Sequence, residues 1–197
     1  NVFRFRPDFP DNKYIYDYTG NPAGIEKHYS AMCRYLDYCE ERLQDGLITF
    51  GLGDWACYLP ASKVSDALVL TGYHYSNLKR MVRFAHLLGR EKDTVEFMRR
   101  STAAAEAFRK AFRREDGSYG PGFAAGGFAL YFGLVPEAET AITAARLAQE
   151  VKVHDYVPEY GIHGNKAIPR ALAENGYAET AYRILARQDY PGFFNCI

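Results

Sequence analysis

The stretch EKDTVEFMRRSTAAAEAFRKAF, residues 91–112, decides the fold class of this sequence. Its apolar residues recur at intervals of three, four or seven positions, which is the period of one face of an α-helix. The residues between them are mostly charged or small, so the pattern predicts a helix with one face toward a core and one toward water. The apolar positions are Val95, Met98, Ala105, Phe108 and Phe112.

The same period continues on both sides of this stretch. Residues 120–133 are rich in Gly and Ala yet apolar, which predicts a closely packed, deeply buried helix. Ser62 is a candidate N-cap for the long helix that precedes residue 91. The other expected helices span residues 22–43, about 64–88, 136–151, 165–174 and 178–188. About seven helices with no alternating strand pattern predict an all-α fold.

Successive helices alternate between apolar segments and segments with one charged face. Inner and outer layers of a helical toroid should differ in this way, although a stack of helical-hairpin repeats would show the same alternation. Residues 1–20, rich in Pro, Asp and aromatics, lack a helical period and are expected to form an N-terminal arm or loop. Residues 21–197 are expected to form the helical domain.

Composition narrows the possible partners. Hydrophobic residues make up 48% and charged residues 24% of the 197 residues, which is an ordinary globular balance. The formal net charge is +0, with positive and negative residues interspersed, so neither nucleic acid nor a membrane surface is an expected partner. The aromatic fraction of 15% is high, and aromatic rings suit contact with the apolar faces of sugars.

The usual signatures of metals and cofactors are missing from the sequence. Cys33, Cys39, Cys57 and Cys196 have neither CxxC spacing nor a His at a metal-ligand interval, so buried free thiols are expected. Residues 120–127 lack the spacing of a dinucleotide-binding loop, so no cofactor is expected. The start at Asn1 and the end after a Tyr-Pro-Gly turn suggest a fragment of a longer chain, and the compartment, periplasmic or cytoplasmic, is left open.

Residues 51–55, GLGDW, form the strongest local candidate for a binding site. Asp54 and Trp55, the only Trp of the chain, lie side by side on a Gly-hinged loop before a helix. A carboxylate accepts hydrogen bonds from vicinal hydroxyls, and an indole covers the apolar side of a pyranose. In the alternative interpretation, Asp54 caps a turn and Trp55 anchors the loop to the core.

Residues 159–163, EYGIH, form the second candidate. Glu159, Tyr160 and His163 bring a carboxylate, a phenol and an imidazole to one short segment before a helix, where they suit hydroxyl recognition or proton transfer. The alternative is a structural loop carboxylate and a hydrogen-bonded structural His. A further possibility is that Asp54 and Glu159 face each other across the mouth of a toroid as a pair of catalytic carboxylates, which the sequence supports only weakly.

Four stretches together resemble the catalytic domain of bacterial alpha-L-rhamnosidases. They are GLGDW at residues 51–55, TGYHY at 71–75 with AHLLG at 85–89, LYFGLVP at 130–136, and residues 160–191 with GIHGNK, ALAENGY, AY and DYPG in the family's order. The resemblance runs from about residue 21 onward. It implies an (α/α)6 six-hairpin toroid and an inverting glycoside hydrolase that acts on terminal alpha-L-rhamnosides.

The resemblance also indicates which functional residues this chain contains. The family's general acid lies in a Cys-Pro-x-Arg-Glu segment and its general base in a Gly-Ala-Thr-Thr-x-Trp-Glu segment, and neither occurs here. Asp54 and Trp55 carry over as substrate-pocket residues, whereas the family more often has Phe, Leu or Val at the position of His163. The toroid is therefore expected to be incomplete and to bind carbohydrate together with the rest of a parent chain. A related toroid acting on another sugar, or a non-catalytic helical-repeat interaction scaffold, is the alternative.

Overall fold

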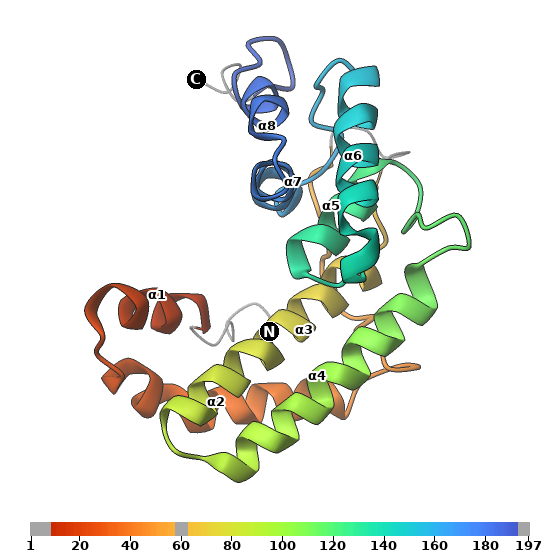
Figure 1. Ribbon diagram of the computed structural model, residues 1–197. Coiled ribbons are helices and arrows are strands. Elements are labelled where there is room, and N and C mark those ends of the chain that lie inside the picture. The colour runs from red at the N-terminus through yellow and green to blue at the C-terminus, as the bar shows by residue number, and fades with distance from the viewer. Residues whose placement is uncertain (1–8, 58–62, 193–197) are drawn as a thin grey trace.

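The computed structural model of the chain describes residues 9–57 and 63–192, and every regular element in those ranges is a helix (Figure 1). The predicted all-α fold is thus confirmed. The helices are α1 (Phe9–Thr19), α2 (Ala23–Glu40), α3 (Asp66–Leu87), α4 (Glu91–Phe112), α5 (Phe123–Phe132), α6 (Glu137–Val153), α7 (Gly164–Glu174) and α8 (Ala178–Leu185). Of these described helices, none combines the length and the apolar character needed to cross a bilayer.

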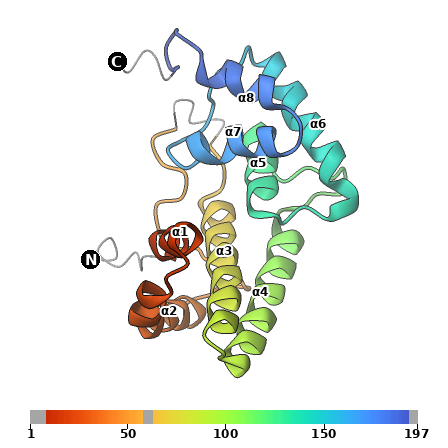
Figure 2. The ribbon, with the colours of Figure 1, turned by 60° about the vertical axis from the view of Figure 1, so that its left-hand side comes forward.

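The helices form four consecutive hairpins arranged in two layers (Figure 1, Figure 2). The odd-numbered helices α1, α3, α5 and α7 contact one another in chain order, and each even-numbered helix packs on the odd-numbered helix before it. The hairpin α1/α2 lies at one end of this curved row and the hairpin α7/α8 at the other. The connections that enter the inner helices α3 and α7 contain the two segments singled out in the sequence.

Helix α5 lies at the centre of the larger hydrophobic core. Most of its residues are buried, as expected for the Gly- and Ala-rich segment, and Phe128 is fully buried. Close packing against α3 depends on Gly72, because a Cβ atom there would lie 2.1 Å from the Phe132 ring. The helix ends at Gly133, whose φ of 69° is a left-handed conformation that a glycine adopts without steric cost.

In helix α4 the apolar period identified the buried face only in part. Ala105 and Phe108 of the predicted stripe are buried, whereas Val95 and Met98 are 67% and 54% exposed. Phe97 and Ala104 complete the buried face. The side chain of Phe97 is larger than that of Val95, so directing Phe97 to the core buries more apolar area.

Helix α1 occupies part of the segment for which an arm or loop was predicted. An ion pair of 2.5 Å between Lys13 and Asp17, one turn apart, supports the helix. Asp17 also accepts Arg83 of α3 at 2.7 Å, which ties α1 to the inner row. The domain boundary at residue 20 stays a prediction.

Ser62 and Cys196 lie outside the described residues, while Cys39 is buried and Cys33 and Cys57 are partly exposed.

A cluster of charged side chains joins α2, α3 and α4. The Arg100 Nη1 atom lies 3.0 Å from Asp37 Oδ1, and its Nε atom lies 3.1 Å from Glu40 Oε1. The Nε2 atom of the buried His74 is 3.2 Å from the same Glu40 oxygen. The hydrogen bond from His74 holds the pKa of Glu40 below its usual value, burial opposes this shift, and Arg100 adds to it. Three helices are therefore joined through one ionised carboxylate.

Candidate functional site

Two loops far apart in sequence meet at the N-terminal ends of α3 and α7. The first contains residues 51–57 and the second residues 154–163. The backbone N–H of Ile162 donates to the carbonyl oxygen of Trp55 at 3.0 Å, so the loops are joined main chain to main chain. Just upstream, the backbone N–H of Ile48 donates to Thr71 Oγ1 at 3.0 Å, which fastens the first loop to α3. Both predicted site segments therefore lie together.

The carboxylate of Asp54 is the main connection between these loops. It accepts backbone N–H groups from Gly161 at 2.7 Å, His163 at 2.8 Å and Gly164 at 3.0 Å. His163 and Gly164 begin α7, where the N–H groups have no partner within the helix and the helix dipole favours a negative charge, and Gly161 lies just before them. Asp54 is 2% exposed. It thus caps a helix that begins more than a hundred residues later.

Gly161 allows the two loops to approach this closely. A Cβ atom on Gly161 would lie 2.2 Å from the Trp55 carbonyl oxygen and 2.7 Å from that of Asp54. Both neighbours are backbone atoms, so a side-chain rotation cannot make room. The sequence therefore needs glycine here for space rather than for an unusual φ.

Trp55 is the member of the first loop that reaches the surface. It is 47% exposed, and the nearby Leu52 is 45% exposed. A half-exposed indole leaves apolar area available for a ligand. Because Asp54 and Trp55 are adjacent but face opposite environments, the carboxylate holds the loop while the indole is presented outward.

Glu159 lies in the second loop with only 9% of its surface exposed. Its Oε1 atom is 2.7 Å from the Nδ1 atom of His154, which lies directly after α6. A hydrogen bond of this length to a carboxylate is a strong one when the imidazole is the donor. His154 is thereby the residue that orients Glu159.

Tyr160 points inward and not toward solvent. It is 3% exposed and packs edge-on against Phe123 with the ring centroids 6.2 Å apart. Burial, and next the charge of Asp54, raise the pKa of its phenol well above the usual value. Its hydroxyl has no hydrogen-bond partner among the described residues. Tyr160 therefore forms the apolar support under the loop.

His163 contacts a residue that the sequence interpretation did not assign to the site. Its Nδ1 atom lies 3.0 Å from the hydroxyl of Tyr73 on α3, and the two rings meet edge-on with centroids 4.9 Å apart. Tyr73 belongs to the TGYHY stretch, so its aromatic side chain was visible, but nothing in the sequence indicated that it faces residue 163. The pair joins the starts of two inner helices.

The arrangement suits recognition better than bond cleavage. Of the predicted site residues, Asp54 and Glu159 are the carboxylates, and each is held by close partners inside the protein. Trp55 presents an apolar ring, and His163 lies nearby on the linked loop. The contacts of all five predicted residues with a ligand stay predictions. What the geometry does show is that Asp54 fixes the spacing of the two loops.

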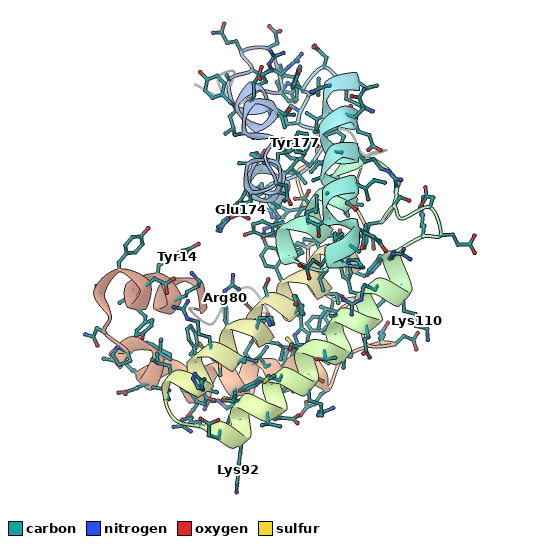
Figure 3. The ribbon with its side chains drawn as sticks, viewed as in Figure 1. Tyr14, Arg80, Lys92, Lys110, Glu174 and Tyr177 are labelled. Atoms are coloured by element: carbon teal, nitrogen blue, oxygen red, sulfur yellow. The ribbon has the colours of Figure 1, made fainter. Side chains whose placement is uncertain are left out.

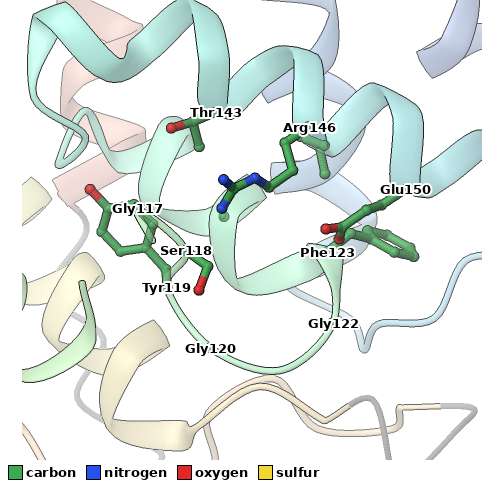
Figure 4. A pocket seen from close by; sticks show the side chains of 11 residues that line it. Gly117, Ser118, Tyr119, Gly120, Gly122, Phe123, Thr143, Arg146 and Glu150 are labelled. Atoms are coloured by element: carbon green, nitrogen blue, oxygen red, sulfur yellow. The ribbon is translucent and has the colours of Figure 1, made fainter. Parts of the chain in front are cut away.

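A separate hollow of about 400 Å³, part of it open to solvent, lies between residues 117–122, α5 and α6 (Figure 4). Arg146 crosses its wall and donates to the carbonyl oxygen of Asp116 at 3.0 Å. None of the five predicted site residues lines it. This hollow is therefore distinct from the loops around Asp54.

The chain is similar in sequence to proteins named alpha-L-rhamnosidase. The chain is 30% identical over 191 residues to an alpha-L-rhamnosidase of Formosa agariphila and 25% identical over 197 residues to one of Alteromonas sp.. These alignments cover 90% and 93% of this chain but only 20% and 21% of the relatives. The chain thus spans about a fifth of the length of these curated relatives.

Solved structures show the same arrangement of helices. The alpha-L-rhamnosidase of Dictyoglumus thermophilum superimposes with a TM-score of 0.84 at 28% identity, over 92% of this chain and 21% of that one. The Streptomyces avermitilis alpha-L-rhamnosidase, solved in complex with L-rhamnose, gives a TM-score of 0.83 at 23% identity, over 92% and 17%. The second likeness concerns the fold alone.

Together these similarities support the toroid over the helical-repeat scaffold, because the relatives named above are all alpha-L-rhamnosidases. The family described as the bacterial alpha-L-rhamnosidase 6 hairpin glycosidase domain matches residues 10–197. Nearly the whole chain therefore belongs to this six-hairpin glycosidase family.

Proposed function

We propose that this chain supplies part of the sugar pocket of an inverting alpha-L-rhamnosidase, whose catalytic acid and base come from other parts of the parent chain. The observation that carries the proposal is the capping of α7 by Asp54, which holds the exposed Trp55 beside the loop of Glu159 and His163. An indole next to hydrogen-bonding side chains is the combination that recognises a pyranose.

Each residue has a distinct part in this proposal. Trp55 covers the apolar face of the rhamnose ring, and His163 and Glu159 lie on the loop that would offer hydrogen bonds to its hydroxyls. Asp54 and Tyr160, both nearly buried, position these side chains from below. Tyr73 orients the His163 ring through the contact at Nδ1.

The chemistry of the parent enzyme would need two further carboxyl groups. One protonates the glycosidic oxygen as the bond to the anomeric carbon breaks, and the other deprotonates a water that attacks this carbon from the opposite face. The result is one free rhamnose of inverted anomeric configuration and the free alcohol. Proton NMR of the reaction of the parent enzyme tests the inversion, because it identifies which anomer of rhamnose is released first.

The fluorescence of the single Trp gives a direct test of the sugar contact. L-rhamnose added to the parent enzyme, with other Trp residues of that chain replaced by Phe, is expected to shift or quench Trp55 emission. Trp55→Ala is expected to raise KM for an aryl alpha-L-rhamnoside about tenfold, with a smaller change in kcat. Val95→Ala, an exposed apolar residue on α4, is the matched control. An unchanged KM in Trp55→Ala would contradict the proposed contact.

The chain alone tests the location of the catalytic carboxylates. We expect no turnover of an aryl alpha-L-rhamnoside by the 197-residue chain. Robust turnover that Asp54→Asn abolishes would show that the missing carboxylates are not required. A panel of other aryl glycosides, assayed with the parent enzyme, separates rhamnose specificity from action on another sugar.

A further inference from the structure

A second pocket lies on the inner side of the helix row, and Trp55, Glu159 and His163 do not line it. It is a hollow of about 640 Å³, part of it open to solvent, bounded by α1, α3, α5 and α7. Figure 3 shows Arg80 on α3 between Tyr14 of α1 and Glu174 of α7.

The charges of this pocket leave one cation unbalanced. Lys13 pairs with Asp17 at 2.5 Å, and Arg170 pairs with Glu174 at 2.7 Å. Arg80 has no carboxylate partner among the described residues, and its one hydrogen bond to a side chain goes to the neutral Asn77 at 2.9 Å. Among the described residues around the pocket, the charge of Arg80 is therefore the one that no carboxylate balances.

The surroundings of Arg80 favour binding an anion. Burial lowers the pKa of its guanidinium, the phenols of Tyr131, Tyr14 and Tyr73 oppose this shift, and Arg170 adds to it. The charged form has therefore lost water, and a bound anion would offset this cost. A guanidinium offers two parallel N–H groups that match a carboxylate.

The remaining walls are aromatic. Tyr14, Tyr73 and Tyr131 line the hollow, and Tyr14 is 39% exposed. The Tyr131 ring packs edge-on against Phe132 at 5.1 Å, and Tyr73 does so at 5.0 Å, which holds these side chains in place. Fixed phenol rings beside a guanidinium suit a ring-shaped ligand with one apolar face and one acidic group.

We propose that this pocket binds a small organic monocarboxylate of the hexuronic acid class, with the carboxylate on Arg80 and the sugar ring against Tyr14 and Tyr131. A single uncompensated charge fits a monoanion better than a doubly charged phosphate or sulfate. The pocket shares Tyr73 with the proposed sugar site, because Tyr73 lines the pocket and contacts His163. Arg80, Tyr14 and Tyr131, on which the proposed ligand would lie, belong to neither of the two Asp54 loops.

Isothermal titration of the 197-residue chain with sodium D-glucuronate at low ionic strength tests the pocket. Glucuronate is expected to bind, whereas D-glucose, the same ring without the carboxylate, is expected to bind at least about tenfold more weakly. Arg80→Gln is expected to weaken glucuronate binding about tenfold or more. Arg99→Gln, which removes an exposed guanidinium paired with Glu96 on α4, is the matched control.

Several outcomes would overturn the proposal. They are the absence of glucuronate binding, equal binding of glucose, unchanged binding by Arg80→Gln, or tighter binding of inorganic phosphate or sulfate. If Arg80→Gln does not fold, as judged by circular dichroism, chemical-shift mapping on the unmodified chain decides. Perturbations at Tyr14 and Tyr131 support the pocket, and perturbations centred elsewhere contradict it.

Discussion

The Oδ1 atom of Asp54 lies 2.8 Å from the backbone nitrogen of His163, 109 positions further along the chain. This contact shows that the two candidate binding residues of the GLGDW segment have different surroundings. Its acid binds the start of a helix, and its indole is what reaches solvent. A carboxylate at the first turn of a helix satisfies donors that would otherwise be buried without partners. Several consequences of this and other close contacts can be measured.

Asp54→Ala is expected to lower the free energy of unfolding by about 3 kcal/mol or more, because it leaves the N–H groups of Gly161, His163 and Gly164 without this acceptor. Asp54→Asn keeps one acceptor oxygen and is expected to lose less. Urea denaturation followed by circular dichroism measures both changes. Glu106→Ala, at an exposed position of α4, is the control and is expected to stay within about 0.5 kcal/mol of the unmodified chain. An equally small change in Asp54→Ala would show that water replaces the carboxylate.

Gly161→Ala is expected to separate the two loops, because its Cβ atom would lie 2.2 Å from the Trp55 carbonyl oxygen. The free energy of unfolding should fall by about 3 kcal/mol through the strain and the lost hydrogen bonds. Emission from Trp55 should change as well. Gly117→Ala is the comparison: its φ is +78° with open space around it, so backbone strain alone should cost about 1–2 kcal/mol. A Gly161→Ala variant no less stable than Gly117→Ala would contradict the close approach.

Gly72→Ala and Gly126→Ala are expected to have opposite effects, although both lie inside helices. At Gly72 the new methyl group meets the Phe132 ring at 2.1 Å, and overpacking there should cost about 1–3 kcal/mol. At Gly126 the nearest atom is Thr143 Cγ2 at 3.7 Å, an ordinary contact. The higher helix propensity of alanine should therefore stabilise this variant by up to about 1 kcal/mol. Thermal unfolding of the two variants measures the difference, and a common sign would refute the packing argument.

The Glu40 cluster is expected to make stability depend on pH in the acid range. The folded state holds the pKa of Glu40 below its usual value of 4.5, chiefly through the hydrogen bond from His74. Its contribution to stability is therefore complete above about pH 4.5 and is lost as the pH falls through the lower, folded-state pKa. Glu40→Gln should reduce the loss of stability between neutral and acid pH, measured by urea denaturation at a series of pH values. Glu106→Gln should retain the slope of the unmodified chain, and an unchanged slope in Glu40→Gln would exclude this carboxylate as a source.

The sequence by itself determined the helices and their succession. The period of three and four along residues 91–112 and the apolar, Gly-rich run before residue 133 both became helices with bounds close to those expected, because helical hydrogen bonds are local. The motif order also identified the family. It did not reveal α1, whose support includes an ion pair from Asp17 to Arg83 of another helix. It identified the buried face of α4 only in part, since Ala105 and Phe108 are buried but Val95 and Met98 are exposed.

Only the tertiary structure decided what the two candidate segments do. The sequence shows which polar and aromatic side chains the GLGDW and EYGIH segments carry. The contact between the two segments depends on how α3 and α7 pack through α5. Hydrogen bonds between residues more than a hundred positions apart leave no period in a sequence. For the same reason Tyr73 beside His163, and Arg80 without a carboxylate among the described residues, emerge only when the inner helices lie side by side. Local residue patterns fix which groups are present, and packing over long separations fixes which of them are neighbours.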